Sequence, residues 1–236
     1  MSISMGELAE LVTSHGGNSA TLCAPQVRYT SVNSLDGDAC LDWQAQLMMS
    51  VAELDGLEVC VGICDFVTVR TGADPFTAEL LDGFSHETSV LAPIFDGAWV
   101  CDAVQDQFDG MPVSAVVLVI SALLTDPLRG HGLGAWMIAE IAHRMLACND
   151  GLLVLGPAPS TGEPDSMRTL EAVERLTQHW CTALGVEAIE GHGGFLGQST
   201  AYVHLGGARD ELRICTEVEV SVPVHTLLRC PELQHL

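Results

Sequence analysis

A glycine-rich segment, Arg129-Gly130-His131-Gly132-Leu133-Gly134, is the part of this sequence whose residue types and spacing could do chemistry. A continuous apolar run precedes it and an amphipathic pattern follows it, which predicts a buried strand, a short loop and a helix. Glycines let a backbone approach an anion closely, and the N–H groups and dipole of a helix start favour negative charge. Arg129 can add a charge-assisted hydrogen bond. The segment therefore predicts a cradle for a diphosphate group.

Two other diphosphate-binding loops share part of this pattern. A Walker loop is excluded because no lysine follows the glycines, and the whole chain contains none. The dinucleotide fingerprint G-x-G-x-x-A is matched by Gly130, Gly132 and Ala135. That fingerprint expects a strand running directly into the first glycine and an acidic residue at the end of the next strand. Here residues 125–129 intervene and the next apolar run ends in Gly156-Pro157, so a dinucleotide site is the weaker alternative.

Hydrophobic periodicity predicts the elements that must position this loop. Asp55-Gly56 is a strong hairpin turn between two strand-like runs. The run before the glycines is nearly continuously apolar, broken by Ser114 and Ser121, as expected for a central strand covered on both faces. The order predicts an α/β fold with a mixed sheet. The strands are expected at 26–32, 43–54, 57–70, 113–125, 152–155, 186–189, 199–205 and 217–224, and the two long helices at 133–148 and 167–184.

The remaining segments divide the chain into one domain with extensions. Residues 1–25 are polar and rich in glycine and serine, which predicts a flexible N-terminal arm with one short helical candidate at Met5 to Val12. The domain itself is expected at 26–206. Its insert at 75–112 has helical periodicity interrupted by glycine and proline, so we expect two or three short helices. Residues 207–236 form a C-terminal strand extension, whose valine-alternating strand could pair across a homodimer.

Composition narrows the partners. The net charge of −22 makes nucleic acid an unsuitable partner and would attract a cationic substrate such as an amine or a basic peptide. The nine cysteines include no C-x-x-C pair and the nine histidines no H-x-x-x-H spacing, so no metal site is expected. No apolar run reaches the roughly 18–20 residues of a membrane span, and no secretory signal opens the chain. We therefore expect a cytoplasmic protein.

The pattern R-x-x-G-x-G, formed by Arg129, Gly132 and Gly134 after a loop of this length, resembles motif A of the GNAT acyltransferase family. A strand ending in proline and a helix ending in Ala183-Leu184-Gly185-Val186 look like the next elements of that family. The resemblance covers about residues 26–206 and is most specific over 113–186. It implies a GNAT-type mixed central sheet with splayed strands, helices on both faces and a helical insert between strands 3 and 4.

The resemblance also implies a reaction. Acetyl-CoA would be the co-substrate, and a primary amine on a small molecule or peptide would attack its thioester directly. The pyrophosphate would be bound by residues of the loop and helix start, and the pantetheine arm would pair with the end of the preceding strand. A backbone N–H, that of Leu124, would hold the oxyanion. These implied contacts fall on Leu123, Leu124, Thr125, Arg129, Gly130, His131, Gly132, Leu133, Gly134 and Ala135.

Two departures from the family pattern affect catalysis. Many members carry a tyrosine four residues before the glycine that ends the last helix, and Cys181 stands there in this chain. Cys181 is therefore a candidate general acid. The insert is the second departure, and among its polar residues Glu87 and His86 are the first candidates for the base that deprotonates the amine. The missing tyrosine keeps a second interpretation open, a non-catalytic acyl-CoA-binding or regulatory GNAT-like protein.

Overall fold

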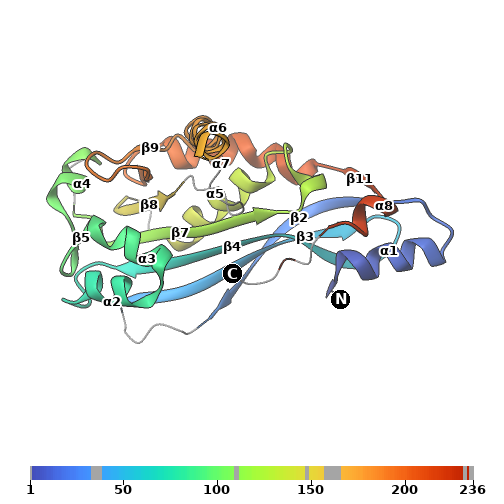
Figure 1. Cartoon of the computed structure of the whole chain (residues 1–236), viewed down its shortest axis with the longest axis horizontal. Coiled ribbons are helices and arrows are strands. Elements are labelled where there is room, and N and C mark those ends of the chain that lie inside the picture. The colour runs from blue at the N-terminus through green and yellow to red at the C-terminus, as the bar shows by residue number, and fades with distance from the viewer. Residues whose placement is uncertain are drawn as a thin grey trace.

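A large mixed sheet organises the computed structural model, which describes residues 2–32, 39–108, 112–146, 149–156, 166–230 and 233. Within these residues, the sheet has nine strands (Figure 1). The pairs β2–β3, β3–β4 and β4–β7 are antiparallel, and β7–β8 is parallel. In spatial order the strands are β11 (Val220–Pro223), β2 (Ser19–Ser31), β3 (Cys40–Val51), β4 (Glu58–Arg70), β7 (Ala115–Leu124), β8 (Gly151–Leu155), β10 (Leu196–Ser199) and β9 (Glu187–Ala188), while β1 (Ser2–Ile3) pairs with β4. The α/β class and the mixed sheet predicted from the sequence are confirmed.

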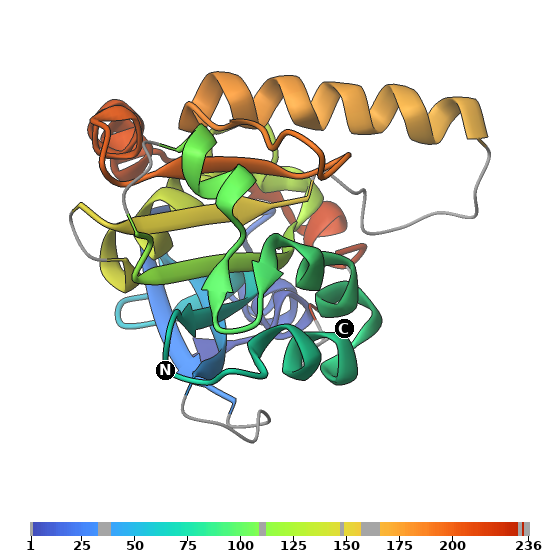
Figure 2. The ribbon, with the colours of Figure 1, turned by 90° about the vertical axis from the view of Figure 1, so that its left-hand side faces the viewer.

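Two hydrophobic clusters cover the two faces of this sheet. Successive side chains of β7 alternate between them, since Val117 and Val119 belong to one and Val116 and Leu118 to the other. This is why the strand reads as a continuous apolar run. The first cluster packs the sheet against α1 (Met5–Ser14) and α5 (Leu133–Met145), and the second packs it against the insert. The helix α6 (Ser166–Leu184) lies beside α5 and α7 (His204–Leu212) (Figure 2).

The β3–β4 hairpin forms as the sequence predicts. Its strands pair from Cys40↔Val69 to Ser50↔Glu58, and the turn between them includes Gly56 with φ +71°. A positive φ is the conformation for which glycine has no steric penalty. The second strand of the hairpin, β4, pairs with β7.

The insert contains the short helices expected and one feature that periodicity does not reveal. Its helices are α2 (Thr77–Phe84), α3 (His86–Leu91) and α4 (Asp102–Gln107), with a 3₁₀ turn η1 (Ala92–Ile94). Between η1 and α4, the chain forms a small hairpin from β5 (Phe95–Asp96) and β6 (Trp99–Val100). The insert lies at the opposite end of the long strands from α1 (Figure 1).

The N-terminal segment differs from the flexible arm expected at 1–25. A capping box at Ser4 and Glu7 begins α1, and the segment continues into β2. The helix buries Met5, Leu8, Ala9 and Val12, which recur at helical spacing on one face. Because these side chains join the main hydrophobic cluster and β1 pairs with β4, this segment is part of the folded domain.

The C-terminal third differs from the expected strands in two places. The strand predicted at 199–205 is wrong beyond Ser199, because α7 begins at His204. The 207–236 extension is largely helical, with a 3₁₀ turn η3 (Arg213–Glu217) and α8 (Val224–Leu227) beside β11. Val220 and Val222 lie in β11, which pairs with β2 of the same chain, and pairing across a homodimer stays a prediction. No helix in the described ranges is long and apolar enough to cross a membrane.

The packing of α1 yields a stability prediction. Leu8 is fully buried, whereas Leu11 of the same helix is only partly covered. Leu8→Ala should lower the free energy of unfolding by about 2–5 kcal/mol, because it leaves a cavity in the core. Leu11→Ala should cost about 1 kcal/mol or less. Urea unfolding of both variants measures these changes. Equally small losses of unfolding free energy in the two variants would indicate that the segment is a loosely packed arm, as the sequence predicted.

Candidate functional site

Among the described residues, the end of β7 is paired on one side only. It pairs with β4 as far as Leu124↔Gly62, but with β8 only from Ala115↔Gly151 to Val119↔Leu155. Residues 120–124 therefore extend beyond the last β8 pair, and all five are partly exposed whereas 116–119 are buried. The two parallel strands thus stop pairing halfway along β7, and an open edge of β7 begins there.

A β-bulge marks the same point. The register with β4 shifts between Asp65↔Ser121 and Phe66↔Val119, which leaves Ile120 as the extra residue on β7. Bulges bend the strand that carries them and increase its twist. The bend coincides with the last residue that β8 pairs, so it accounts for the separation of the two strands.

The backbone groups of Leu124 face the open edge. The Thr125 N–H donates to the Val61 carbonyl of β4 at 2.9 Å. Because N–H and C=O groups alternate in direction along an antiparallel pair, those of Leu124 point away from β4. The Leu124 carbonyl accepts a hydrogen bond from Nε of Arg129 at 3.2 Å, which agrees with this direction. A ligand lying along the open edge would meet this N–H.

The glycine segment joins this edge to the start of α5. A 3₁₀ turn η2 (Asp126–Leu128) follows β7, and Gly130 and Gly132 then adopt φ +82° and φ +73°. Gly132 is the N-cap residue of α5, and no side chain caps the helix. The first helical hydrogen bond runs from the Trp136 N–H to the Gly132 carbonyl at 3.0 Å. The backbone N–H groups at 133–135 precede that bond, so they are the unsatisfied donors of the helix start.

The start of α5 carries the partial positive charge of the helix dipole. Its first turn contains no acidic residue. Arg129 is exposed and forms an ion pair with Asp126, with 3.0 Å between Nη1 and Oδ1. Together with the helix dipole, the guanidinium gives this place an attraction for anions. The loop predicted from the sequence thus has a conformation that suits a diphosphate.

Gly134 allows the start of α5 to approach the end of β7. A Cβ on Gly134 would lie 3.3 Å from Leu124 Cδ1 and 3.7 Å from the Trp180 ring of α6. The structure therefore brings Leu124, the glycine loop and the C-terminal half of α6 together, as the implied site requires. Cys181 follows Trp180, and its half-buried side chain packs against the main hydrophobic cluster. Its role as a general acid stays a prediction.

The other candidate residues lie on the insert. His86 and Glu87 are exposed at the start of α3. Hydrogen bonds from its own backbone N–H and from Ser85 hold the pKa of Glu87 below its usual value, so this carboxylate is charged at neutral pH. Leu91 of α3 shares a hydrophobic cluster with Val116 and Leu118, in the half of β7 that β8 also pairs. Base roles for His86 and Glu87 stay predictions.

A buttress that the sequence did not reveal supports the loop. The Cys215 thiol of η3 donates to the His131 carbonyl at 3.3 Å. A Cβ on Gly132 would lie only 2.8 Å from Cys215 Sγ. Burial raises the pKa of this thiol, which keeps it protonated as the donor. The C-terminal segment is thus packed directly against the loop.

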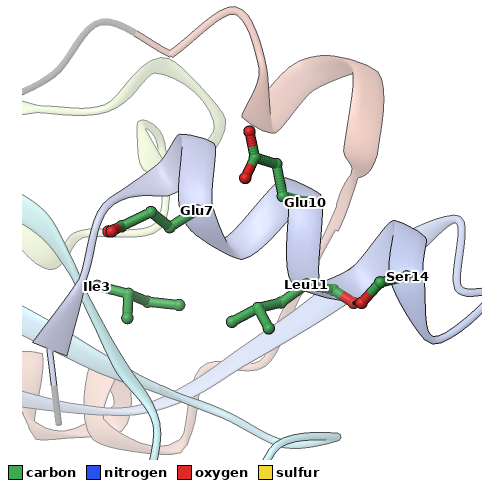
Figure 3. A pocket seen from close by; sticks show the side chains of 5 residues that line it. All are labelled: Ile3, Glu7, Glu10, Leu11 and Ser14. Carbon is green, nitrogen blue, oxygen red and sulfur yellow. Dashed lines mark hydrogen bonds between the residues drawn. The ribbon is translucent and has the colours of Figure 1, made fainter.

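Two shallow hollows lie near these elements. One of about 410 Å³ borders α5, α7 and η3, and inside it Arg209 pairs with Glu140 at 2.8 Å. The other, of about 420 Å³, lies on the outer side of α1, where the side chains of Glu7, Glu10 and Leu11 project (Figure 3). Neither is lined by the glycine segment, so the open edge of β7 remains the candidate site. The first hollow is lined by Trp136, Glu140, Arg209, Asp210, Arg213 and Thr216, and the second by Ile3, Glu7, Glu10, Leu11 and Ser14.

Comparison of the chain with family models, curated proteins and solved structures gives no match. The functional assignment therefore rests on the geometry of the site.

The two positive-φ glycines of the loop provide a test of the buttress. Alanine at Gly130 would meet open space, whereas alanine at Gly132 would meet Cys215. Both substitutions should cost about 1 kcal/mol for the backbone conformation. Gly132→Ala should lower the free energy of unfolding by about 1–3 kcal/mol more than Gly130→Ala, because its methyl group overpacks against Cys215. In a Cys215→Ala background that excess should disappear, because the sulfur is gone. A double-mutant cycle by urea unfolding measures this, and equal costs at the two glycines would argue against the buttress.

Proposed function

We propose that the chain is an acyltransferase that moves an acetyl group from acetyl-CoA to a primary amine by direct attack. The observation that carries the proposal is the open edge of β7, which begins at the Val119↔Leu155 pair and leads directly into the glycine loop. An extended pantetheine arm pairs with such an edge in the manner of an added strand. This is the arrangement expected of the GNAT family.

The loop chemistry fits the pyrophosphate of coenzyme A. Uncapped N–H groups at the start of α5 and the exposed guanidinium of Arg129 supply donors and positive charge in a chain that is otherwise strongly acidic. The Thr125–Arg129 connection, which includes η2, separates β7 from the first glycine. A dinucleotide site would need the strand to reach that glycine directly, so coenzyme A is the better fit.

We propose that the Leu124 N–H assists the chemical step. When an amine attacks a thioester, negative charge develops on the carbonyl oxygen. A fixed backbone N–H directed at that oxygen stabilises the charge, and removal of such a donor typically costs two to three orders of magnitude in rate. Leu124 offers this N–H on the open edge. The bulge at Ile120 bends the strand just before it.

The net charge of the chain indicates the class of amine that would accept the acetyl group, but not its identity. A net charge of −22 attracts amines in their cationic form, which must lose a proton before attack. Glu87, whose lowered pKa keeps it ionised, and His86 are the proposed proton acceptors. Cys181 is the proposed donor to the leaving thiolate. The proposed substrate class is a small-molecule or peptidic primary amine.

A non-catalytic acyl-CoA-binding function is the second candidate, and the position of the tyrosines favours it. The chain has only Tyr29 and Tyr202, and neither lies on α6. Burial raises the pKa of Tyr29 to about 12, and the guanidinium of Arg144 on α5 lies over its ring, 5.7 Å from the centroid. Coenzyme A release from acetyl-CoA over a panel of amines separates the two functions. Tight binding of acetyl-CoA without turnover on any amine would favour the second.

A pair of substitutions at Gly130 tests the anion cradle. Space around Gly130 is open and its φ of +82° is one that asparagine and aspartate tolerate. Gly130→Asp should weaken acetyl-CoA binding by at least about tenfold relative to Gly130→Asn, because the added carboxylate repels the pyrophosphate.

Isothermal titration calorimetry with acetyl-CoA measures this effect, and the asparagine variant controls for size and backbone strain. Equal acetyl-CoA affinities in the two variants would show that the pyrophosphate does not bind at this loop. The double change Gly132→Asp with Arg129→Ala should give a still larger loss.

A further inference from the structure

A cysteine and a histidine far apart in the sequence meet on the other face of the sheet. Cys101 Sγ, at the start of α4, lies 3.7 Å from Nε2 of His192, in the loop between β9 and β10. This distance is within hydrogen-bond range for sulfur, and 91 residues separate the two. Both side chains are half-buried. A thiol beside an imidazole is the arrangement that activates a nucleophile through an adjacent base.

The contact is held by a clamp between α4 and the β9–β10 loop. The Gln107 side chain donates to the Ala188 carbonyl at 2.8 Å and accepts from the Glu190 N–H at 2.9 Å. Phe108 packs over Gly197 of β10, where an added Cβ would lie 3.0 Å from its ring. These contacts fix the two carrier segments against each other. The thiol and the imidazole therefore meet as a consequence of a built interface.

Each member of the pair is also fixed locally. The Cys101 N–H donates to the Ile94 carbonyl at 2.9 Å. The His192 N–H donates to the Ile189 carbonyl at 3.2 Å, and the His192 carbonyl accepts from the Phe195 N–H at 3.2 Å. The backbones on both sides of the contact are thus held by hydrogen bonds. Little conformational entropy remains to be lost when the thiol reacts.

The other cysteines of the described residues have different surroundings. The thiols of Cys23, Cys60, Cys215 and Cys230 donate to backbone carbonyls, which cannot take up a proton. Cys40 and Cys64 are buried among hydrophobic side chains, and the half-buried Cys181 packs against the main hydrophobic cluster. Cys101 is the one with a recorded contact to an imidazole nitrogen.

We propose that Cys101 and His192 form a second reactive site, in which the Cys101 thiol is a nucleophile and His192 is its proton acceptor. The proton of Sγ–H passes to Nε2, and the thiolate forms an S–C bond to an electrophilic carbon. The leaving group departs with the electron pair of the bond that breaks, and the imidazolium returns its proton to the leaving group or to water. The site takes a small carbon electrophile.

The surrounding charges define the kind of electrophile. Charged groups on α4, β5, β9 and the β9–β10 loop are all carboxylates: Asp96, Asp102, Asp106, Glu187 and Glu190. All of these residues are exposed, so their influence on the pair is screened by solvent and salt. They disfavour an anionic reagent. The electrophile is therefore not an anion, and the half-burial of the pair limits its size.

The position of the pair separates this site from the glycine loop. Cys101 packs against the hydrophobic cluster on the insert side of the sheet, whereas α5 belongs to the opposite cluster. The β9–β10 loop, which contains His192, ends at Leu196, the first residue of β10. Leu196 pairs with Leu155, and Leu155 is the last β8 residue that pairs with β7. The inference needs no bound acyl-CoA and stands apart from the proposed acyltransferase function.

Alkylation by iodoacetamide, located by peptide mass spectrometry on the full folded chain, tests the proposal without acyl-CoA. At about pH 7, where an unassisted thiol is mostly protonated, Cys101 should react faster than the half-buried Cys23. His192→Gln should slow Cys101 about tenfold or more and leave Cys23 unchanged. At about pH 10 the thiol ionises without help, and Cys101 should react equally fast in both proteins.

Two outcomes would overturn the proposal. One is an unchanged Cys101 rate in His192→Gln at neutral pH. The other is a difference that persists at high pH, since that would reflect altered access to the thiol rather than proton transfer. Gln107→Ala loosens the clamp without touching either member of the pair, and it should also slow Cys101 at neutral pH only. If His192→Gln fails to fold, Gln107→Ala provides the test instead. An unchanged alkylation rate of Cys101 in Gln107→Ala would then contradict the proposal.

Discussion

The unequal pairing of β7 is the constraint on which the rest of the structure depends. This strand pairs with β4 along its whole length, but its pairing with β8 ends at Val119, next to the bulge formed by Ile120. Everything specific to the site follows from that difference. Backbone groups that a continuous sheet would use internally are turned outward at Leu124, next to the start of α5. A strand edge can be left open in this way only where a ligand, a loop or solvent satisfies it.

The glycine loop is supported by packing against several other elements. Trp180 of α6 and Leu124 of β7 approach Gly134, and Cys215 of η3 approaches Gly132. Substitutions at these glycines would therefore disturb packing as well as ligand contacts. The conformation that presents the N–H groups is set before any ligand arrives, so little binding energy is lost in ordering the loop.

The sequence predicted what periodicity and composition can encode. The β3–β4 hairpin, the apolar β7, α5 and the glycine loop were predicted because each is local. The helix α1 was underestimated, since only four buried side chains in a polar segment signal it. The strand expected at 199–205 was wrong because Val203, though apolar, is 83% exposed and precedes a helix. Contacts such as Cys215 with His131 and Cys101 with His192 depend on tertiary placement, which no spacing rule contains.

The hydrogen bond from Cys215 to His131 also has a consequence for biosynthesis. Its donor is translated 84 residues after its acceptor, and β11, which completes the sheet beside β2, is made later still. A ribosome-bound chain can thus fold its hairpin and most of its sheet while the glycine loop still lacks its buttress. Under the proposed function, competence to bind acetyl-CoA at this loop would be acquired only in the last stage of synthesis, so incomplete chains would not sequester it.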